Sequence, residues 1–101
     1  MEHLTWDIYE ISSEQHSLIG VKCRGRIRKY GLENSINVLA ENASDAPGNV
    51  RFALVANSDP SSIEEFLTRL FHDIKIEKVL PYVPNPVLSK LDINDATRYE
   101  I

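Results

Sequence analysis

Hydrophobic and polar positions alternate along four stretches of the chain, and a period of two predicts β-strands. These stretches are residues 4–11, 18–28, 50–56 and 74–83. Within residues 18–28 the alternation is clean, with apolar or small residues on one face and basic residues on the other. Such a pattern is typical of a sheet that is covered on one side only. In residues 74–83 the alternation slips between Ile76 and Val79, and Pro81 lacks the N–H of a ladder, so we expect an edge strand.

Two other stretches have the period of an amphipathic helix. Residues 31–43 carry one apolar stripe, made of Leu32, Ile36, Leu39, Ala40 and Ala43. Residues 60–71 carry a second stripe, and Asp59 followed by Pro60 is typical of a helix start. The chain is therefore predicted to be α+β, a ferredoxin-like two-layer sandwich in the order β-β-α-β-α-β. Right-handed crossovers would give parallel pairs in a mixed sheet with both helices on one face.

The 101 residues are enough for a single domain with one core. The C-terminal tail, about 85–101, has two open interpretations: a short docked helix near Leu91, or a terminal strand from Thr97 to Ile101. The predicted core consists of Ile19, Val21, Cys23, Ile27, Leu32, Ile36, Leu39, Val50, Phe52, Leu54, Ile63, Phe66, Leu67 and Leu70.

Charge and composition exclude several classes of function. Lys and Arg number 11 and Asp and Glu 15, so the formal net charge is −4. An acidic domain does not adhere in bulk to nucleic acid or to an anionic membrane. No apolar run approaches the roughly 20 residues of a membrane helix, and the first residues lack the layout of a signal peptide. Cys23 is the only cysteine, which favours a reducing, cytoplasmic location.

The most unusual feature is a run of five basic residues among eight positions without an acid: Lys22, Arg24, Arg26, Arg28 and Lys29. One interpretation is an anion site, for phosphate, a nucleotide or RNA, on the open sheet face, with Tyr9 and Tyr30 as stacking surfaces. The simpler interpretation, which we favour, is pairing with Asp7 and Glu10 across a hairpin.

The stretch from Val21 to Leu70 resembles the acylphosphatase family. That family has a strand that ends in a G-R-V-Q-G-V-x-F-R pattern and opens into a helix. The run aligned with it here is Gly25-Arg26-Ile27-Arg28-Lys29-Tyr30-Gly31-Leu32-Glu33. Residues 48–56 resemble the central strand of the family, residues 60–67 the start of its second helix, and residues 76–79 the following strand.

The resemblance implies a phosphate site made of loop N–H groups and a helix N-terminus. In the family the last arginine of the pattern binds the phosphoryl oxygens, and an asparagine on the next strand orients the attacking water. With this alignment Glu33 stands at the arginine position, Lys29 replaces a loop glycine, and the strand that carries the asparagine is missing. A carboxylate there repels an acyl phosphate.

We therefore predict an acylphosphatase-like domain without hydrolase activity or catalytic residues, which acts as a binding or interaction module. The candidate residues for binding phosphate or another small anion are Arg26, Arg28, Lys29, Tyr30 and Gly31. Two alternatives stay open: acyl phosphate hydrolysis with a displaced arginine, Arg26 or Arg28, and binding of RNA or a nucleotide on the open sheet face.

No metal or other cofactor is predicted. His3, His16 and His72 have no ligand spacing, and Cys23 belongs to the predicted core face, where a thiol packs as a small hydrophobe. An edge strand beside an apolar tail offers a surface for a homodimer. Neither a membrane nor a nucleic acid is an expected partner.

Overall fold

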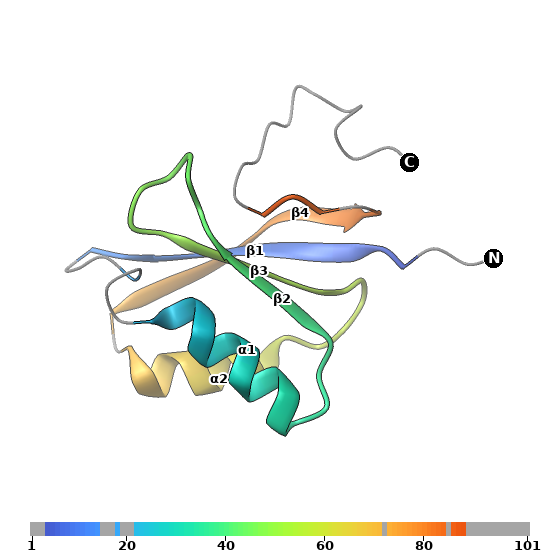
Figure 1. Cartoon of the computed structure of the whole chain (residues 1–101), viewed down its shortest axis with the longest axis horizontal. Helices are drawn as coiled ribbons and strands as arrows, with labels where there is room; N and C mark the ends of the chain where they lie inside the picture. The colour runs from blue at the N-terminus through green and yellow to red at the C-terminus, as the bar shows by residue number, and fades with distance from the viewer. Residues whose placement is uncertain (1–3, 15–17, 19–21, 72, 85, 89–101) are drawn as a thin grey trace.

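The structure, a computed structural model, describes residues 4–14, 18, 22–71, 73–84 and 86–88 (Figure 1). Its elements are β1 (Trp6–Ser13), α1 (Cys23–Glu33), β2 (Val38–Asn42), β3 (Val50–Val55), α2 (Ser61–Leu70) and β4 (Ile74–Val83). The four strands form one sheet in the order β2-β3-β1-β4, and each neighbouring pair is antiparallel. Both helices lie on the same side of this sheet (Figure 1). The predicted α+β class and its two layers are confirmed.

The predicted order of elements is wrong in the first half of the chain. A helix, α1, covers much of the stretch that was expected to be a strand, and β2 lies inside the expected helix 31–43. The observed order is β-α-β-β-α-β, and the sheet is antiparallel, not mixed. Alternation misled because Cys23, Ile27 and Gly31 also recur at every fourth position, and these three are the buried residues of α1.

The second half follows the prediction. β3, α2 and β4 lie where the periodicity placed them, and β4 is an edge strand beside β1. Asp59 Oδ1 accepts the backbone N–H of Ser61 at 2.9 Å at the start of α2. The pairing of β4 with β1 is irregular where Lys78, Leu80 and Val83 meet β1, just past the predicted slip.

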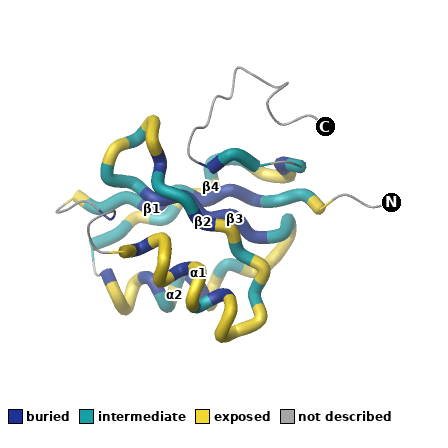
Figure 2. Tube along the Cα trace, viewed as in Figure 1, coloured by how far each residue is buried: buried dark blue, intermediate teal, exposed yellow. Residues whose placement is uncertain are grey.

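The core between the helices and the sheet contains half of the predicted residues (Figure 2). The confirmed members are Cys23, Ile27, Val50, Phe52, Leu54, Ile63 and Leu67. Leu32, Leu39 and Leu70 are exposed, so their assignment to the core was wrong. Ile36 and Phe66 are partly buried against the core, and the Phe66 ring stacks on Tyr30 with centroids 4.2 Å apart. Ile19 and Val21 lie outside the described residues.

A second apolar cluster lies on the sheet face opposite the helices. It consists of Ile8, Ala53, Val83 and Leu88, with Trp6 packed against it. The segment that ends at Leu88 therefore covers part of the face that was expected to be open. The rest of the predicted tail, residues 85 and 89–101, lies outside the described residues. Among the described helices, none is long and apolar enough to cross a membrane.

Candidate anion site between α1 and β2

The basic run lies on α1 and not on the sheet, so its expected position was wrong. Lys22 directly precedes the helix, and Arg24, Arg26, Arg28 and Lys29 belong to it. The expected acidic partners are also engaged elsewhere. Glu10 pairs with Arg51, and Asp7 pairs with Lys78. Tyr9 is buried in the core against Phe52 and offers no stacking surface for a base. The sheet-face site for RNA thus loses both its charges and one of its aromatic rings.

α1 runs antiparallel to β2. Three contacts define this arrangement: Gly31 with Val38, Arg28 with Ala40, and Arg24 with Glu41. The start of α1 therefore lies beside the end of β2. Asn42 is the last residue of β2, and it shares its sheet face with Ala40, which is buried in the core next to α1. The fold thus brings Arg24 and Asn42 to the same end of the two elements.

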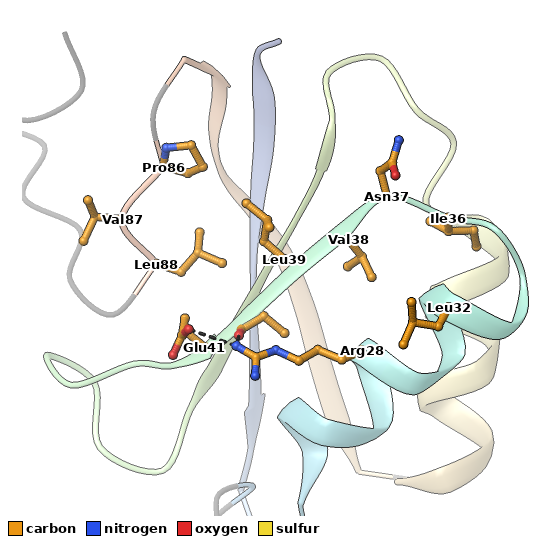
Figure 3. Close-up of a pocket in the computed structure, with 11 residues that line it drawn as sticks. Arg28, Leu32, Ile36, Asn37, Val38, Leu39, Glu41, Pro86, Val87 and Leu88 are labelled. Atoms are coloured by element: carbon orange, nitrogen blue, oxygen red, sulfur yellow. Dashed lines mark hydrogen bonds and ion pairs between the residues drawn. The ribbon is translucent and has the colours of Figure 1, made fainter. Parts of the chain in front are cut away.

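An ion cluster joins the two elements, and Figure 3 shows the part of it between Arg28 and Glu41. Glu41 Oε1 lies 2.9 Å from Arg28 Nη2, and Glu41 Oε2 lies 3.5 Å from Arg24 Nη1. Arg28 Nη2 also donates to the carbonyl oxygen of Ala40 at 2.7 Å. The side chains of Arg24 and Glu41 are 44% and 46% exposed. Two guanidinium groups share one carboxylate, so the cluster keeps an excess of positive charge within reach of solvent.

The charges of α1 oppose its own dipole. Its first turn has no acidic residue and its last turn no basic one, and no side chain caps its N-terminus. Lys22 and Arg24 stand instead at the positive end, where cations are unfavourable. In α2 the arrangement is the ordinary one, with Glu64 in the first turn and Arg69 in the last. An anion at the start of α1 would satisfy both the basic side chains and the helix end.

The approach to α1 is anchored to the β2–β3 loop. Leu18 is buried, and its N–H donates to the carbonyl oxygen of Gly48 at 2.9 Å. The N–H of Cys23 in turn donates to the carbonyl oxygen of Leu18 at 3.4 Å. Gly48 has a φ of 89°, which favours glycine. Lys22 has a φ of 59°, a conformation that non-glycine residues rarely adopt and that clusters at functional sites.

The five residues predicted to bind an anion do not form one site. Arg28 reaches β2, and Gly31 is buried against β2. Arg26, Lys29 and Tyr30 line a separate groove of about 210 Å³ together with Glu33 of the same helix and with Phe66 and Leu70 of α2. Glu33, which was expected at the mouth of a phosphate site, is the last residue of α1, roughly 15 Å along the helix from Cys23.

A larger groove of about 620 Å³ runs along β2. Its walls are α1, β2 and the segment 86–88, and Arg28 and Glu41 lie at one end of it (Figure 3). Exposed Leu32 and Leu39 contribute apolar surface. β2 is also an edge strand of the described sheet. The homodimer expected from an edge strand stays a prediction.

Sequence reasoning missed Arg24 and Asn42 as a pair. The signal that could have found Arg24 is the run Gly20-Val21-Lys22-Cys23-Arg24, which places an arginine at the second residue of the helix. Asn42 was assigned to a helix end, and only the strand assignment of residues 38–42 gives it a place beside Arg24.

Within the described part of the chain, no group of three or more His, Cys, Asp or Glu side chains is arranged to hold a metal ion. The chain matches no protein-family model, no curated protein and no solved structure, so its function rests on the geometry of its own residues.

Proposed function

We propose that this chain is an acylphosphatase-like domain that binds the phosphoryl group of an acyl phosphate at the start of α1 and hydrolyses it. The observation that carries the proposal is the contact of Arg24, in the first turn of α1, with Glu41 near the end of β2, which places Arg24 beside the strand end at Asn42. Together with the β-α-β-β-α-β order, which is that of the ferredoxin-like motif, it supports a different alignment with the family pattern.

In that alignment the helix start observed at Cys23 replaces the start expected at residue 31. The run Gly20-Val21-Lys22-Cys23-Arg24 then keeps the Gly, Val and Arg of the G-V-x-F-R end of the pattern. Arg24 stands at the arginine position, and the strand that seemed to be missing is β2, with Asn42 as its last residue. The objection from Glu33 no longer applies, because Glu33 ends α1.

The proposed chemistry needs little more than positioning and charge. The planar guanidinium of Arg24 would hold two phosphoryl oxygens as a fork, and the positive end of α1 would stabilise their negative charge. Asn42 would hold a water molecule in line with the acyl oxygen. Water adds to phosphorus, the bond from phosphorus to the acyl oxygen breaks, and the carboxylate leaves with the electron pair. The proton lost by the water ends on phosphate or solvent.

The test is hydrolysis of benzoyl phosphate by the wild-type protein and by Arg24→Ala and Asn42→Ala. We expect turnover above the uncatalysed rate. Arg24→Ala should lower kcat/KM about 100-fold or more, because it removes a donor that stabilises the transferred group. Asn42→Ala should mainly lower kcat, by about 10-fold or more, because the Asn42 side chain orients the water but carries no charge that binds the substrate.

Two matched controls are available. Arg26→Ala removes the arginine that lies two residues after Arg24 in α1. Asn37→Ala removes an exposed asparagine just before β2. Both should leave kcat/KM within about twofold. If the wild-type protein hydrolyses benzoyl phosphate no faster than the uncatalysed rate, the proposal is overturned. Inorganic phosphate binding without turnover would instead support the anion-binding module expected from the sequence.

A further inference from the structure

Glu41 is the one acidic residue seen in contact with Arg24 among the described ion pairs. The contact is loose, 3.5 Å between Arg24 Nη1 and Glu41 Oε2. The contact of the same carboxylate with Arg28 is tighter, 2.9 Å between Glu41 Oε1 and Arg28 Nη2. Arg28 is itself fixed by its bond to the carbonyl oxygen of Ala40. Glu41 therefore has a close ion pair with Arg28 and a weaker one with Arg24, which a ligand can displace.

A carboxylate and a phosphate present the same chemistry to a guanidinium, because both offer a pair of anionic oxygens to its fork. Glu41 thus occupies Arg24 in the way that a ligand phosphoryl group would. When an anion binds Arg24, the carboxylate loses its weaker contact and keeps the Arg28 contact. It still lies near the bound anion and repels it. Both effects lower the affinity of the site for phosphate.

We propose that Glu41 is a positioning residue that competes with phosphate for Arg24, and that Arg28 holds Glu41 while the site is filled. This inference rests on the proposed function, since it assumes that Arg24 binds the phosphoryl group. Its consequence is a weak hold on inorganic phosphate, the product of the reaction. A site with Arg24 unopposed would bind the product more tightly and be inhibited by it.

The inference predicts opposite changes in phosphate affinity for two single variants, and no added change when the two are combined. Glu41→Gln keeps the size of the side chain and removes the competitor, so the affinity for phosphate should rise about fivefold, the scale of one half-exposed ion pair. Arg28→Met leaves Glu41 with Arg24 as its arginine, so the affinity should fall about threefold. In the double variant Arg28→Met has no competitor to release, so the affinity should equal that of Glu41→Gln.

The experiment is titration with inorganic phosphate, followed by calorimetry or NMR, so that binding is measured without turnover. KM and kcat for benzoyl phosphate are measured in parallel, and Glu41→Gln should lower KM while kcat changes less than twofold. Glu33→Gln, at the far end of α1, is the matched control and should alter neither. Thermal unfolding of each variant shows that the domain stays folded.

Unchanged or weaker phosphate binding by Glu41→Gln would overturn the inference. An equal loss from Arg28→Met in both backgrounds would also overturn it, because Arg28 would then be a phosphate ligand itself. Tighter binding by Glu41→Gln without any turnover in the wild type would sustain the inference while the proposed hydrolysis failed. Turnover that depends on Arg24 with no effect of Glu41→Gln would do the reverse. If neither the wild type nor any variant binds phosphate, both the inference about Glu41 and the proposed function are overturned.

Discussion

Arg51 and Glu10 form an ion pair inside the protein, with 2.6 Å between Arg51 Nε and Glu10 Oε1. Arg51 is only 4% exposed. Its Nη1 also lies 2.6 Å from Asp45 Oδ1 and donates to the carbonyl oxygen of Leu88 at 3.2 Å. The Arg51 side chain of β3 thus joins β1, the β2–β3 loop and the segment 86–88. The same β2–β3 loop contains Gly48, whose carbonyl oxygen accepts the N–H of Leu18 before α1.

Replacing Arg51 with methionine should therefore destabilise the fold. The change leaves two carboxylates without their shared cation, and breaking a buried pair in this way costs several kcal/mol. Because Glu10 and Asp45 keep some contact with solvent, we expect a loss of about 2–3 kcal/mol in the free energy of unfolding. Urea denaturation measures it. Arg69→Met, which breaks the exposed pair with Glu65, should cost less than about 0.5 kcal/mol. Equal costs for the two variants would contradict the role of Arg51.

Asp7 makes the stability of the fold depend on pH in the acidic range. It is 2% exposed, and burial alone would raise its pKa. The backbone N–H groups of Tyr82 and Asn57, which donate to its carboxylate at 3.2 Å, and the ion pair with Lys78 together outweigh burial. The pKa of Asp7 therefore lies below its ordinary 3.8. The stabilising contribution of Asp7 is complete above pH of about 4 and is lost as the pH falls through the lowered pKa.

We expect Asp7→Asn to lower the free energy of unfolding at pH 7 by about 1–2 kcal/mol, since the two backbone N–H groups bond different carboxylate oxygens and the amide has only one acceptor oxygen. The variant should also lose part of the decline in stability between pH 4 and acid unfolding. Denaturation curves at several pH values between 2.5 and 7 check this. Glu65→Gln, on the exposed face of α2, is the control, and its curve should parallel the wild type. A parallel curve for Asp7→Asn would refute the assignment.

Two glycines of α1 should respond to alanine with opposite signs. A Cβ on Gly25 would meet nothing within 4 Å, so Gly25→Ala should stabilise the helix by about 0.5–1 kcal/mol. A Cβ on Gly31 would lie 2.3 Å from Val38 Cγ1 and 3.0 Å from the carbonyl oxygen of Ile36. Gly31→Ala should therefore force α1 away from β2 and cost about 1–3 kcal/mol. Thermal and urea unfolding of the two variants decide the matter, and equal signs would show that α1 and β2 do not approach so closely.

Gly31 also shows what sequence patterns could and could not predict. β3, α2 and β4 were found because each has an unambiguous period and clear turn residues at its ends. α1 was mistaken for a strand because its buried stripe is narrow and includes a glycine, so it carries little apolar signal. β2 was mistaken for a helix because exposed Leu32 and Leu39 completed a helical stripe with residues that do face the core.

These two errors also concealed the candidate site. The role proposed for Arg24 depends on the end of β2 lying beside the start of α1, a relation between elements that no local pattern encodes. With residues 38–42 assigned to a helix, Asn42 could not be recognised as the end of a strand. The family pattern was therefore matched nine residues too late, with its last position on Glu33 and not on Arg24. Once the helix start is known, the same pattern selects Arg24.

Cys23 is the first residue of α1, next to Arg24. A cysteine at a helix N-terminus beside an arginine is the usual setting of a reactive thiolate. Here the side chain is fully buried, and burial raises the pKa of the thiol to about 11 in spite of the nearby Arg26 charge. At pH 8 only about one thiol in a thousand is ionised at that pKa, so we expect the folded protein to react with iodoacetamide at least 100-fold more slowly than the urea-unfolded chain. Cys23→Ala should keep the hydrolysis of benzoyl phosphate within about threefold of the wild type, provided that unfolding curves show a folded variant. Rapid labelling of the folded protein would show that the thiol is accessible and ionised, against its burial. Loss of turnover in folded Cys23→Ala would show that the thiol takes part in the reaction.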